Sequence, residues 1–473
     1  MVFSSNIFIF YFLPIFLGLY FLADKKYKNY VALFASVIFY AWGAPRFIFV
    51  VLGSILADFY LVRQMYNSEG KTKKVYLVLS VILNIGLLAY FKYANFFVDN
   101  LNALLNTIGI GSISMAKIVL PIGISFFTFQ KFTYTIDVFR GKHKPLDKVS
   151  DLFLYILLFP QLIAGPIVRY SEIADQLTNR EQNENVDNRI KGFYRFIIGL
   201  AKKVLIANVM GAEADKIFSL DPNAISTSTA WIGVLAYTFQ IYFDFSGYSD
   251  MAIGLGKMIG FKFPENFNNP YVSRSISEFW RRWHMTLGRW MKDYLYIPLG
   301  GNRVNSNFRL YFNLWFVFLI SGLWHGASWT FVAWGAFHGL FLILDILFLM
   351  KFLDKIGKLP SIVLTFLVTV VGWVIFRSLT MDFAADYIAK MFTFKGGLII
   401  EPDIEFWTIF IIATLFSFIT AFKPGYKLEQ KVFFGDYSVS GYLVMAVIVI
   451  ILLVLCAGSI TSSGFNPFIY FRF

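Results

Sequence analysis

The stretch SGYLVMAVIVIILLVLCAGS (440–459) runs for twenty positions without a charged residue. An α-helix rises about 1.5 Å per residue, so about 20 apolar residues cross the hydrocarbon core of a bilayer. Hydrophobic residues make up 58% of the chain and aromatic residues 20%, and the mean hydropathy is +0.62. This composition excludes a soluble globular protein and predicts a polytopic membrane protein. The other apolar runs lie at 5–22, 30–42, 46–62, 75–91, 118–138, 151–168, 193–209, 229–255, 308–320, 323–350, 360–376 and 404–422.

These runs are continuous rather than alternating, so we expect an all-α membrane protein. The span rule gives about eleven or twelve transmembrane helices. The short runs 30–42 and 308–320 predict additional tilted or re-entrant pieces. Met1–Ala23 lacks a basic n-region and a cleavage site, so it is expected to be a retained first span rather than a signal peptide. With no internal repeat and no low-complexity linker, residues 1–473 are expected to form one catalytic membrane domain with an aromatic tail at 461–473.

Clusters of basic residues beside the runs predict the topology, because lysine and arginine are enriched in cytoplasmic loops. With the N-terminus outside, the first three clusters fall on the cytoplasmic side, and the fourth joins them if the number of crossings is even. Twelve crossings are therefore favoured, and they place the tail on the extracytoplasmic side. The net charge of +13 follows from these clusters and gives no reason to expect a nucleic-acid partner. The mixed-charge connection 171–192 is expected to be a cytoplasmic loop. The four clusters are Lys25, Lys26 and Lys28; Arg63, Lys71, Lys73 and Lys74; Arg140, Lys142, Lys144 and Lys148; and Lys423, Lys427 and Lys431.

The stretch SEFWRRWHMTLGRWMKDYLYIPLGGNR (277–303) combines a histidine with aromatic and basic residues. At 100° per residue, one helical arc holds the aromatic residues and His284, and another holds the basic residues. We therefore expect one helix that ends before Pro298, with its aromatic arc along a tunnel and its arginines toward the cytosol. An interfacial anchor would explain the tryptophans and arginines but not a histidine on the buried arc. The first arc contains Trp280, Trp283, His284, Leu287, Trp290, Met291 and Tyr294, and the second contains Arg281, Arg282, Arg289 and Lys292.

A second histidine lies in SGLWHGASW (321–329), at the head of a long apolar run. Gly322 and Gly326 are four residues apart, which lets another backbone approach closely. No lysine or arginine occurs from 310 through 350, and the only carboxylate in that stretch, Asp345, would lie roughly 30 Å further along a helix, so His325 has no obvious ion partner in the local sequence. An imidazole in the bilayer is costly, and proton transfer is a common reason to keep one. His338 follows thirteen residues later, about 220° round a continuous helix, so we expect it to face elsewhere with a structural role.

Other polar groups give weaker signals. Asp244 and Asp250 lie in an apolar stretch, QIYFDFSGYSD (240–250), where a carboxylate must be paired or must line a wet cavity. For these carboxylates a structural pairing with an arginine or histidine is favoured over direct chemistry. The single cysteine, Cys456, is expected to be a small buried hydrophobe. The chain offers no cysteine pair and no carboxylate–histidine motif, so no metal site is expected.

These stretches resemble the membrane-bound O-acyltransferase (MBOAT) family, and in particular the branch that supplies acetyl groups for exported polysaccharides such as alginate. The stretch FPQLIAGPIVRY (159–170) matches the same branch, and the resemblance covers nearly the whole chain. It implies the MBOAT fold around a central funnel or tunnel, with His325 as the catalytic histidine and His284 as its companion. Trp280, Trp283, Trp324 and Asp244 then become candidates for the tunnel wall. Arg281 and Arg282 become candidates for docking a coenzyme A phosphate.

The chain ends in FNPFIYFRF (465–473). This tail resembles the C-terminal motif of the small membrane peptide of teichoic-acid D-alanylation, in which a terminal tyrosine is proposed to carry the acyl group. The resemblance makes Tyr470 a candidate acyl carrier, whereas an aromatic interfacial anchor is the plainer interpretation.

Together the resemblances imply a bacterial inner-membrane O-acetyltransferase. It would use acetyl-CoA as donor, need no other cofactor, and pass the acetyl group to an extracytoplasmic partner resembling SGNH hydrolases. That partner would modify alginate, cellulose, peptidoglycan or a wall polysaccharide. Three alternatives remain: D-alanyl transfer to teichoic acid and, in other functional classes, a proton-coupled transporter and a non-catalytic scaffold for a polysaccharide-export complex.

Overall fold

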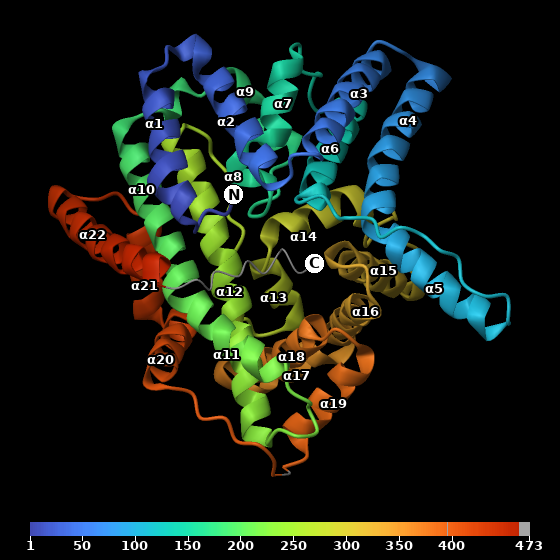
Figure 1. Ribbon diagram of the computed structural model, residues 1–473, viewed down its shortest axis with the longest axis vertical. Coiled ribbons are helices and arrows are strands. Elements are labelled where there is room, and N and C mark those ends of the chain that lie inside the picture. Colours follow the sequence, from blue (N-terminus) through green and yellow to red (C-terminus); the bar gives the residue numbers. More distant parts are fainter. Residues whose placement is uncertain (395, 463–473) are drawn as a thin grey trace. The chain divides into compact units, whose positions relative to one another are not determined.

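Helices form the regular structure of the residues described, which are 1–394 and 396–462 of the computed structural model (Figure 1). A helix satisfies its own backbone hydrogen bonds, which a lipid environment cannot do. The predicted all-α class is thereby confirmed, and the only β-bridge in these ranges is an isolated one between Ile225 and Leu398. Tyr470 and most of the predicted tail lie outside the described residues.

Six helical segments among the described residues are long and apolar enough to cross a membrane. The predicted number of eleven or twelve crossings stays a prediction. The short run at 308–320 belongs to a 19-residue helix, Asn307–His325. The six segments are Ile48–Tyr66, Gly70–Thr107, Trp329–Ile356, Lys358–Arg377, Ile404–Ala421 and Val439–Ser462.

The chain divides into two compact units, and the predicted single catalytic domain over 1–473 stays a prediction. The N-terminal unit comprises residues 1–189 and 255–263, and the C-terminal unit comprises 190–254 and 264–473. The elements of the N-terminal unit are η1 (Phe8–Phe12), α1 (Leu13–Leu22), η2 (Lys25–Tyr27), α2 (Lys28–Gly43), α3 (Ile48–Tyr66), α4 (Gly70–Leu88), η3 (Ala89–Tyr93), α5 (Ala94–Thr107), α6 (Ile124–Phe139), α7 (Val149–Leu157), α8 (Phe159–Leu162), α9 (Tyr170–Thr178) and η4 (Glu181–Asn183).

An ion pair is buried among α3, α4 and α6 of the N-terminal unit, which lie side by side (Figure 1). Nζ of Lys131 lies 3.1 Å from Oδ2 of Asp58, and each side chain is only 1% exposed. Ser80 donates a hydrogen bond to Oδ1 of Asp58 at 2.7 Å, and Asn84 donates to both carboxylate oxygens. A buried charge is tolerated only when such partners replace its water shell.

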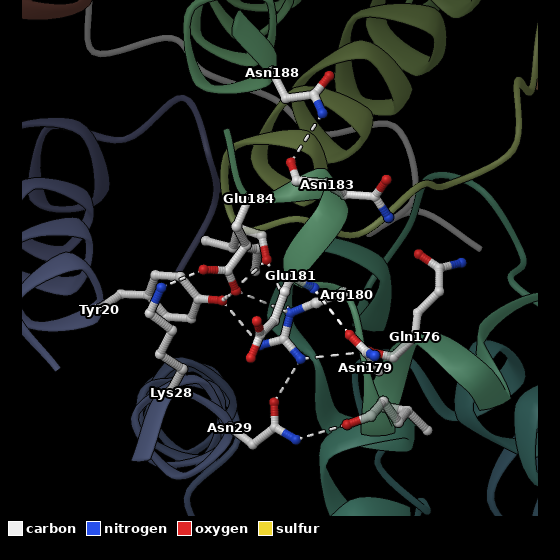
Figure 2. Close-up of polar contacts among 12 residues, drawn as sticks. Tyr20, Lys28, Asn29, Gln176, Asn179, Arg180, Glu181, Asn183, Glu184 and Asn188 are labelled. Carbon is white, nitrogen blue, oxygen red and sulfur yellow. Dashed lines mark hydrogen bonds and ion pairs between the residues drawn. The ribbon is translucent and has the colours of Figure 1, made fainter. Parts of the chain in front are cut away.

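The connection 171–192, which we expected to be a loop, is largely helical, since it contains most of α9, all of η4 and the start of α10. In this segment Arg180 is bound by partners from distant parts of the chain (Figure 2). The Arg180 guanidinium donates to the backbone oxygen of Ile259 at 3.0 Å and to the hydroxyl of Tyr20 at 2.9 Å. Tyr20 in turn donates to Glu184 at 2.7 Å. These contacts hold residues 171–189 as an ordered part of the N-terminal unit.

The C-terminal unit contains most of α10 and α12 and every later element. Its elements are α10 (Val186–Ala201), η5 (Lys202–Ala207), α11 (Asn208–Phe218), α12 (Thr227–Met258), η6 (Pro270–Val272), α13 (Ile276–Arg282), α14 (Met285–Met291), η7 (Lys292–Tyr296), α15 (Asn307–His325), α16 (Trp329–Leu344), η8 (Asp345–Leu349), α17 (Met350–Ile356), α18 (Lys358–Arg377), α19 (Met381–Phe392), α20 (Ile404–Phe418), η9 (Ile419–Ala421), α21 (Lys423–Phe433) and α22 (Val439–Ser462).

Helices α15 and α16 form an antiparallel hairpin that is closed by glycines. A Cβ atom at Gly322 would lie 2.2 Å from the backbone oxygen of Phe331, and one at Gly335 would lie 2.4 Å from that of Phe318. No side chain fits there, so the two backbones approach as closely as predicted at Gly322. A Cβ atom at Gly326 would instead collide with the side-chain ring of Phe331, not with a backbone. The hairpin therefore holds the end of α15 firmly against α16.

We expect Asp58→Ala to lower the stability of the protein by about 3–5 kcal/mol, because it leaves Lys131 charged and buried without its partner. The double variant Asp58→Ala/Lys131→Met removes both charges and should recover much of this loss. Thermal unfolding of the detergent-solubilised variants measures the difference. Equal midpoints for the single and double variants would contradict an energetic role for the pair.

Candidate active site

The segment around His284 is bent rather than straight, so the prediction of one continuous helix through 277–297 is wrong. Helix α13 ends at Arg282 and α14 begins at Met285, and His284 between them has φ 45°, in the left-handed region. Such a conformation is uncommon for a residue other than glycine and needs support from its surroundings.

The loop before α13 supplies that support. The backbone N–H of Met285 donates to the backbone oxygen of Asn266 at 2.9 Å, and the N–H of Asn268 donates to the backbone oxygen of Arg282 at 2.9 Å. These groups lie at the bend, where a continuous helix would have used them internally. A long-range backbone pairing therefore stops α13 and turns the chain at His284.

His284 is 1% exposed, and its ring is held by a side chain from the same loop. Nδ1 of His284 lies 3.0 Å from Oδ1 of Asn266, and the Phe245 ring of α12 contacts the imidazole edge-on. Burial lowers the pKa of His284 well below its usual value, and the neighbouring His325 lowers this pKa further. The imidazole of His284 is therefore neutral near pH 7.

His325 is the last residue of α15 and is 7% exposed. Its Nδ1 lies 2.7 Å from the backbone oxygen of Ser321, one helical turn earlier. A carbonyl oxygen only accepts hydrogen bonds, so Nδ1 carries the proton, and in the neutral ring Nε2 is then the acceptor. This is the tautomer that a general base acting through Nε2 requires.

Aromatic rings connect the two histidines. The centroid of the Trp324 ring lies 4.9 Å from that of His325 and 6.1 Å from that of His284. Trp334 of α16 packs edge-on against His325 at 5.0 Å, and Phe376 of α18 does so at 5.5 Å. The fold thus brings together the two histidines that the sequence singled out, although 41 residues separate them.

His338 does not face elsewhere as expected. Helix α15 ends at His325 and α16 begins at Trp329, so the rotation of a continuous helix does not relate the two histidines. His338 packs against Trp334, the tryptophan that also contacts His325. Its ring centroid lies 5.1 Å from that of Trp334 and 5.0 Å from that of Trp280. His338 is fully buried, and a Cβ atom added at Gly372 would lie only 2.7 Å from its Nε2. This tight packing agrees with the structural role that was predicted.

The remaining predicted residues fall into two groups. Trp283 is buried and packs against Trp373 of α18, whereas Trp280 packs against Trp334. Whether these rings line a tunnel stays a prediction. On the other face of α13, Arg281 is exposed, and Arg282 is paired with Glu278 at 2.9 Å. Of the two arginines, Arg281 is therefore the better placed to meet a ligand phosphate.

Asp244 is 1% exposed and forms an ion pair with Lys203 at 2.9 Å, so its partner is a lysine rather than the predicted arginine or histidine. Asp250, six residues further along α12, does have an arginine partner as predicted, since it is held by Arg195 at 2.7 Å and also by Lys202 at 2.6 Å. The two lysines lie within the apolar run 193–209, where their charge was a signal that the sequence analysis did not use. Among the described residues, no group of three histidine, cysteine or carboxylate side chains is arranged to bind a metal ion.

Two contributors to the site escaped the sequence analysis. Trp334 was one tryptophan among many in an apolar run, and nothing local distinguished it. Asn266 lies in the polar stretch PENFNN (264–269), whose asparagines were not distinguishable from ordinary loop residues. Both act through contacts between segments far apart in the sequence.

Comparison with known proteins identifies the family of this chain. Residues 89–381 match the sequence profile of the membrane-bound O-acyltransferase family. The chain is 41% identical to the probable alginate O-acetylase AlgI of Pseudomonas putida over all of both chains. It is 45% identical to the corresponding Pseudomonas aeruginosa protein over 83% of this chain and 75% of that one. It is 38% identical to the peptidoglycan O-acetyltransferase of Helicobacter pylori over 84% of this chain and 80% of that one. The chain therefore belongs to the membrane-bound O-acyltransferase family and is a multi-pass membrane acyltransferase.

Proposed function

We propose that this protein takes an acetyl group from cytosolic acetyl-CoA and delivers it across the bacterial inner membrane for O-acetylation of an extracytoplasmic polysaccharide. The full-length similarity to probable alginate O-acetylases carries this proposal. The peptidoglycan O-acetyltransferase relative supports the same reaction with a different acceptor polymer. The shared chemistry is transfer of an acetyl group to a sugar hydroxyl outside the cell.

The tautomer of His325 supports its role as general base. In the proposed step, Nε2 of His325 takes the proton of an acceptor hydroxyl as the hydroxyl oxygen attacks the thioester carbonyl. The new C–O bond forms, the C–S bond breaks, and the coenzyme A thiolate leaves and takes the proton back from the imidazolium. General-base catalysis of this kind contributes about 10²–10⁴-fold to a rate. His284 would orient the reacting groups from the other side of Trp324.

The acetyl group must then reach the extracytoplasmic side without being lost to water. We propose Tyr470 as the acceptor in the first step, because a phenyl ester is an activated donor for a second transfer. An extracytoplasmic partner resembling SGNH hydrolases would accept the group from Tyr470 and pass it to the polymer. D-alanyl transfer to teichoic acid is the competing proposal within the family, and it differs in the donor.

We expect His325→Ala to abolish acetyl transfer while the protein still accumulates in the membrane, because it removes the proposed general base. The measurement is base-released acetate from alginate made by a producing host that lacks its own membrane acetylase and carries the variant. His338→Gln is the matched control, since it alters a buried histidine on the same tryptophan, and we expect it to remain active. Full acetylation by His325→Ala at equal protein levels would remove His325 from the mechanism.

We expect His284→Ala to keep a measurable residual activity, since it removes an orienting group rather than the base.

We expect Tyr470→Phe to stop acetyl transfer as well, although it removes a single oxygen and keeps an aromatic anchor. Mass spectrometry of the C-terminal peptide, from protein incubated with acetyl-CoA, should show an acetyl group on Tyr470 that is absent in His325→Ala. Full activity of Tyr470→Phe with no acetyl adduct would rule out the relay through Tyr470. In that case the acetyl group would pass directly to the partner's nucleophile.

We expect Arg281→Glu to raise the KM for acetyl-CoA about tenfold with little change in kcat, because losing a charge-assisted contact to a phosphate weakens ground-state binding. The exposed Lys355 provides a matched charge reversal, Lys355→Glu, that should leave the KM unchanged. Equal effects of the two variants would assign Arg281 to the membrane interface instead. Use of a D-alanyl carrier protein in place of acetyl-CoA by the unaltered protein would favour the teichoic-acid alternative.

A further inference from the structure

The side chain of Asn266 has one orientation that satisfies all its neighbours. The backbone N–H of Thr286 points at the amide group from 3.4 Å, and a backbone N–H can only donate. The amide atom that faces it is therefore the oxygen, Oδ1. The amide nitrogen on the other side donates to Oγ of Ser249 at 3.0 Å. The Ser249 hydroxyl can donate or accept, so it fits either orientation, and the Thr286 N–H is the partner that assigns the amide.

The orientation of Asn266 decides which nitrogen of His284 carries a proton. Oδ1 accepts a hydrogen bond from the Thr286 hydroxyl at 2.8 Å, and it lies 3.0 Å from Nδ1 of His284. An amide oxygen cannot donate, so Nδ1 must be the protonated nitrogen. In the neutral ring, Nε2 is then a hydrogen-bond acceptor, as it is in His325.

The same residue also holds the backbone of the bend. The main-chain oxygen of Asn266 accepts the N–H of Met285, directly after His284, while its side chain holds the His284 ring. Asn266 is fully buried, and Asn266 therefore fixes both the position and the tautomer of one imidazole.

We propose that Asn266 is the positioning residue of His284, and that it keeps this imidazole neutral with Nε2 as the acceptor during acetyl transfer. The inference rests on the proposed function for its catalytic meaning, but the state of the imidazole can be measured without any donor. An uncharged amide oxygen suits this role because it orients the ring without stabilising the imidazolium as a carboxylate would. Asn266 does not touch the substrate in this proposal, since it acts through His284.

The charged groups near this contact are already paired or already named. Glu265 precedes Asn266 and is bound by Arg195 at 2.6 Å, and Arg195 also holds Asp250 of α12. From α15, His325 is the titratable group that acts electrostatically on His284. From α12 and α15, the Phe245 and Trp324 rings that contact His284 are uncharged. A new carboxylate at position 266 would therefore be the added negative charge nearest to the ring.

Asn266→Asp tests the proposal because a carboxylate can accept the same hydrogen bonds but also stabilises the imidazolium. An opposite charge within hydrogen-bonding distance raises a histidine pKa by about 1–3 units. The imidazole would then lose its proton only at higher pH, and the low-pH limb of the rate profile should move to higher pH by a similar amount. Activity should approach that of the unaltered protein at the alkaline end. Asn266→Ala, which removes the acceptor, should lower kcat at all pH values by on the order of 10–100-fold, as loss of an orienting partner typically does.

Ser249→Ala is the matched control, since it weakens the loop contact of the Asn266 amide nitrogen without touching the contact to His284. We expect it to lower activity slightly and to leave the pH profile in place. A purely structural role for Asn266 predicts that all three variants lower activity equally at every pH, and that result would overturn the proposal. An unchanged profile for Asn266→Asp would overturn it as well.

The second readout is deuterium exchange at the imidazole C2–H, followed by mass spectrometry of individual peptides in detergent without donor. The exchange midpoint of His284 should move to higher pH in Asn266→Asp, while that of His338 in the same sample should not move. An unmoved His284 midpoint contradicts the proposal whatever the activity. If the His284 midpoint moves but the unaltered protein transfers no acetyl group from acetyl-CoA, the positioning contact stands and the proposed function fails.

Discussion

A polar group that is buried in a membrane domain has no water to bind, and it must find its partner within the protein. The described residues provide two kinds of partner for buried polar groups. The carboxylates Asp58 and Asp244 are each paired with a lysine, so charge is neutralised by charge. The imidazoles of His284 and His325 instead donate to uncharged oxygens, an amide in one case and a backbone carbonyl in the other. An uncharged oxygen stabilises an imidazolium less than a carboxylate would, so neither contact adds a negative charge beside its ring.

The glycine contact between α15 and α16 has a direct consequence for the site. Gly322 lies three residues before His325, and Gly335 directly follows Trp334, the residue that packs edge-on against the His325 ring. The contact that closes the hairpin therefore also sets the distance between this tryptophan and the imidazole. A larger residue at either glycine would separate the helices and move both rings, so packing and chemistry are linked at this point.

Much of this fold could be predicted from the apolar runs, because a long uncharged segment has few alternatives to a spanning helix. The bend at His284 could not be predicted in the same way, since the periodicity of 277–297 describes a helix only if it is continuous. What stops α13 is the backbone of the loop around Asn266, which no local pattern reveals. The error at His338 was avoidable in principle, because Gly326 and Ser328 are turn and cap residues that indicate a helix end between His325 and Trp329. The pairing of the two histidines rested on a family resemblance, and the pattern of residues alone left His325 without a partner.

The proposed reaction must also return a proton, and two neutral imidazoles suit that need. A base paired with a carboxylate would hold its proton strongly after taking it from the hydroxyl. Here the imidazolium formed at His325 has a carbonyl oxygen as its Nδ1–H partner, and the leaving group is a thiolate. A thiol ordinarily has a higher pKa than an imidazolium, so the thiolate is the stronger base and takes the proton in the proposed step. The same proton that leaves the hydroxyl can then depart with coenzyme A, and the site returns to its neutral state without exchanging charge with the membrane.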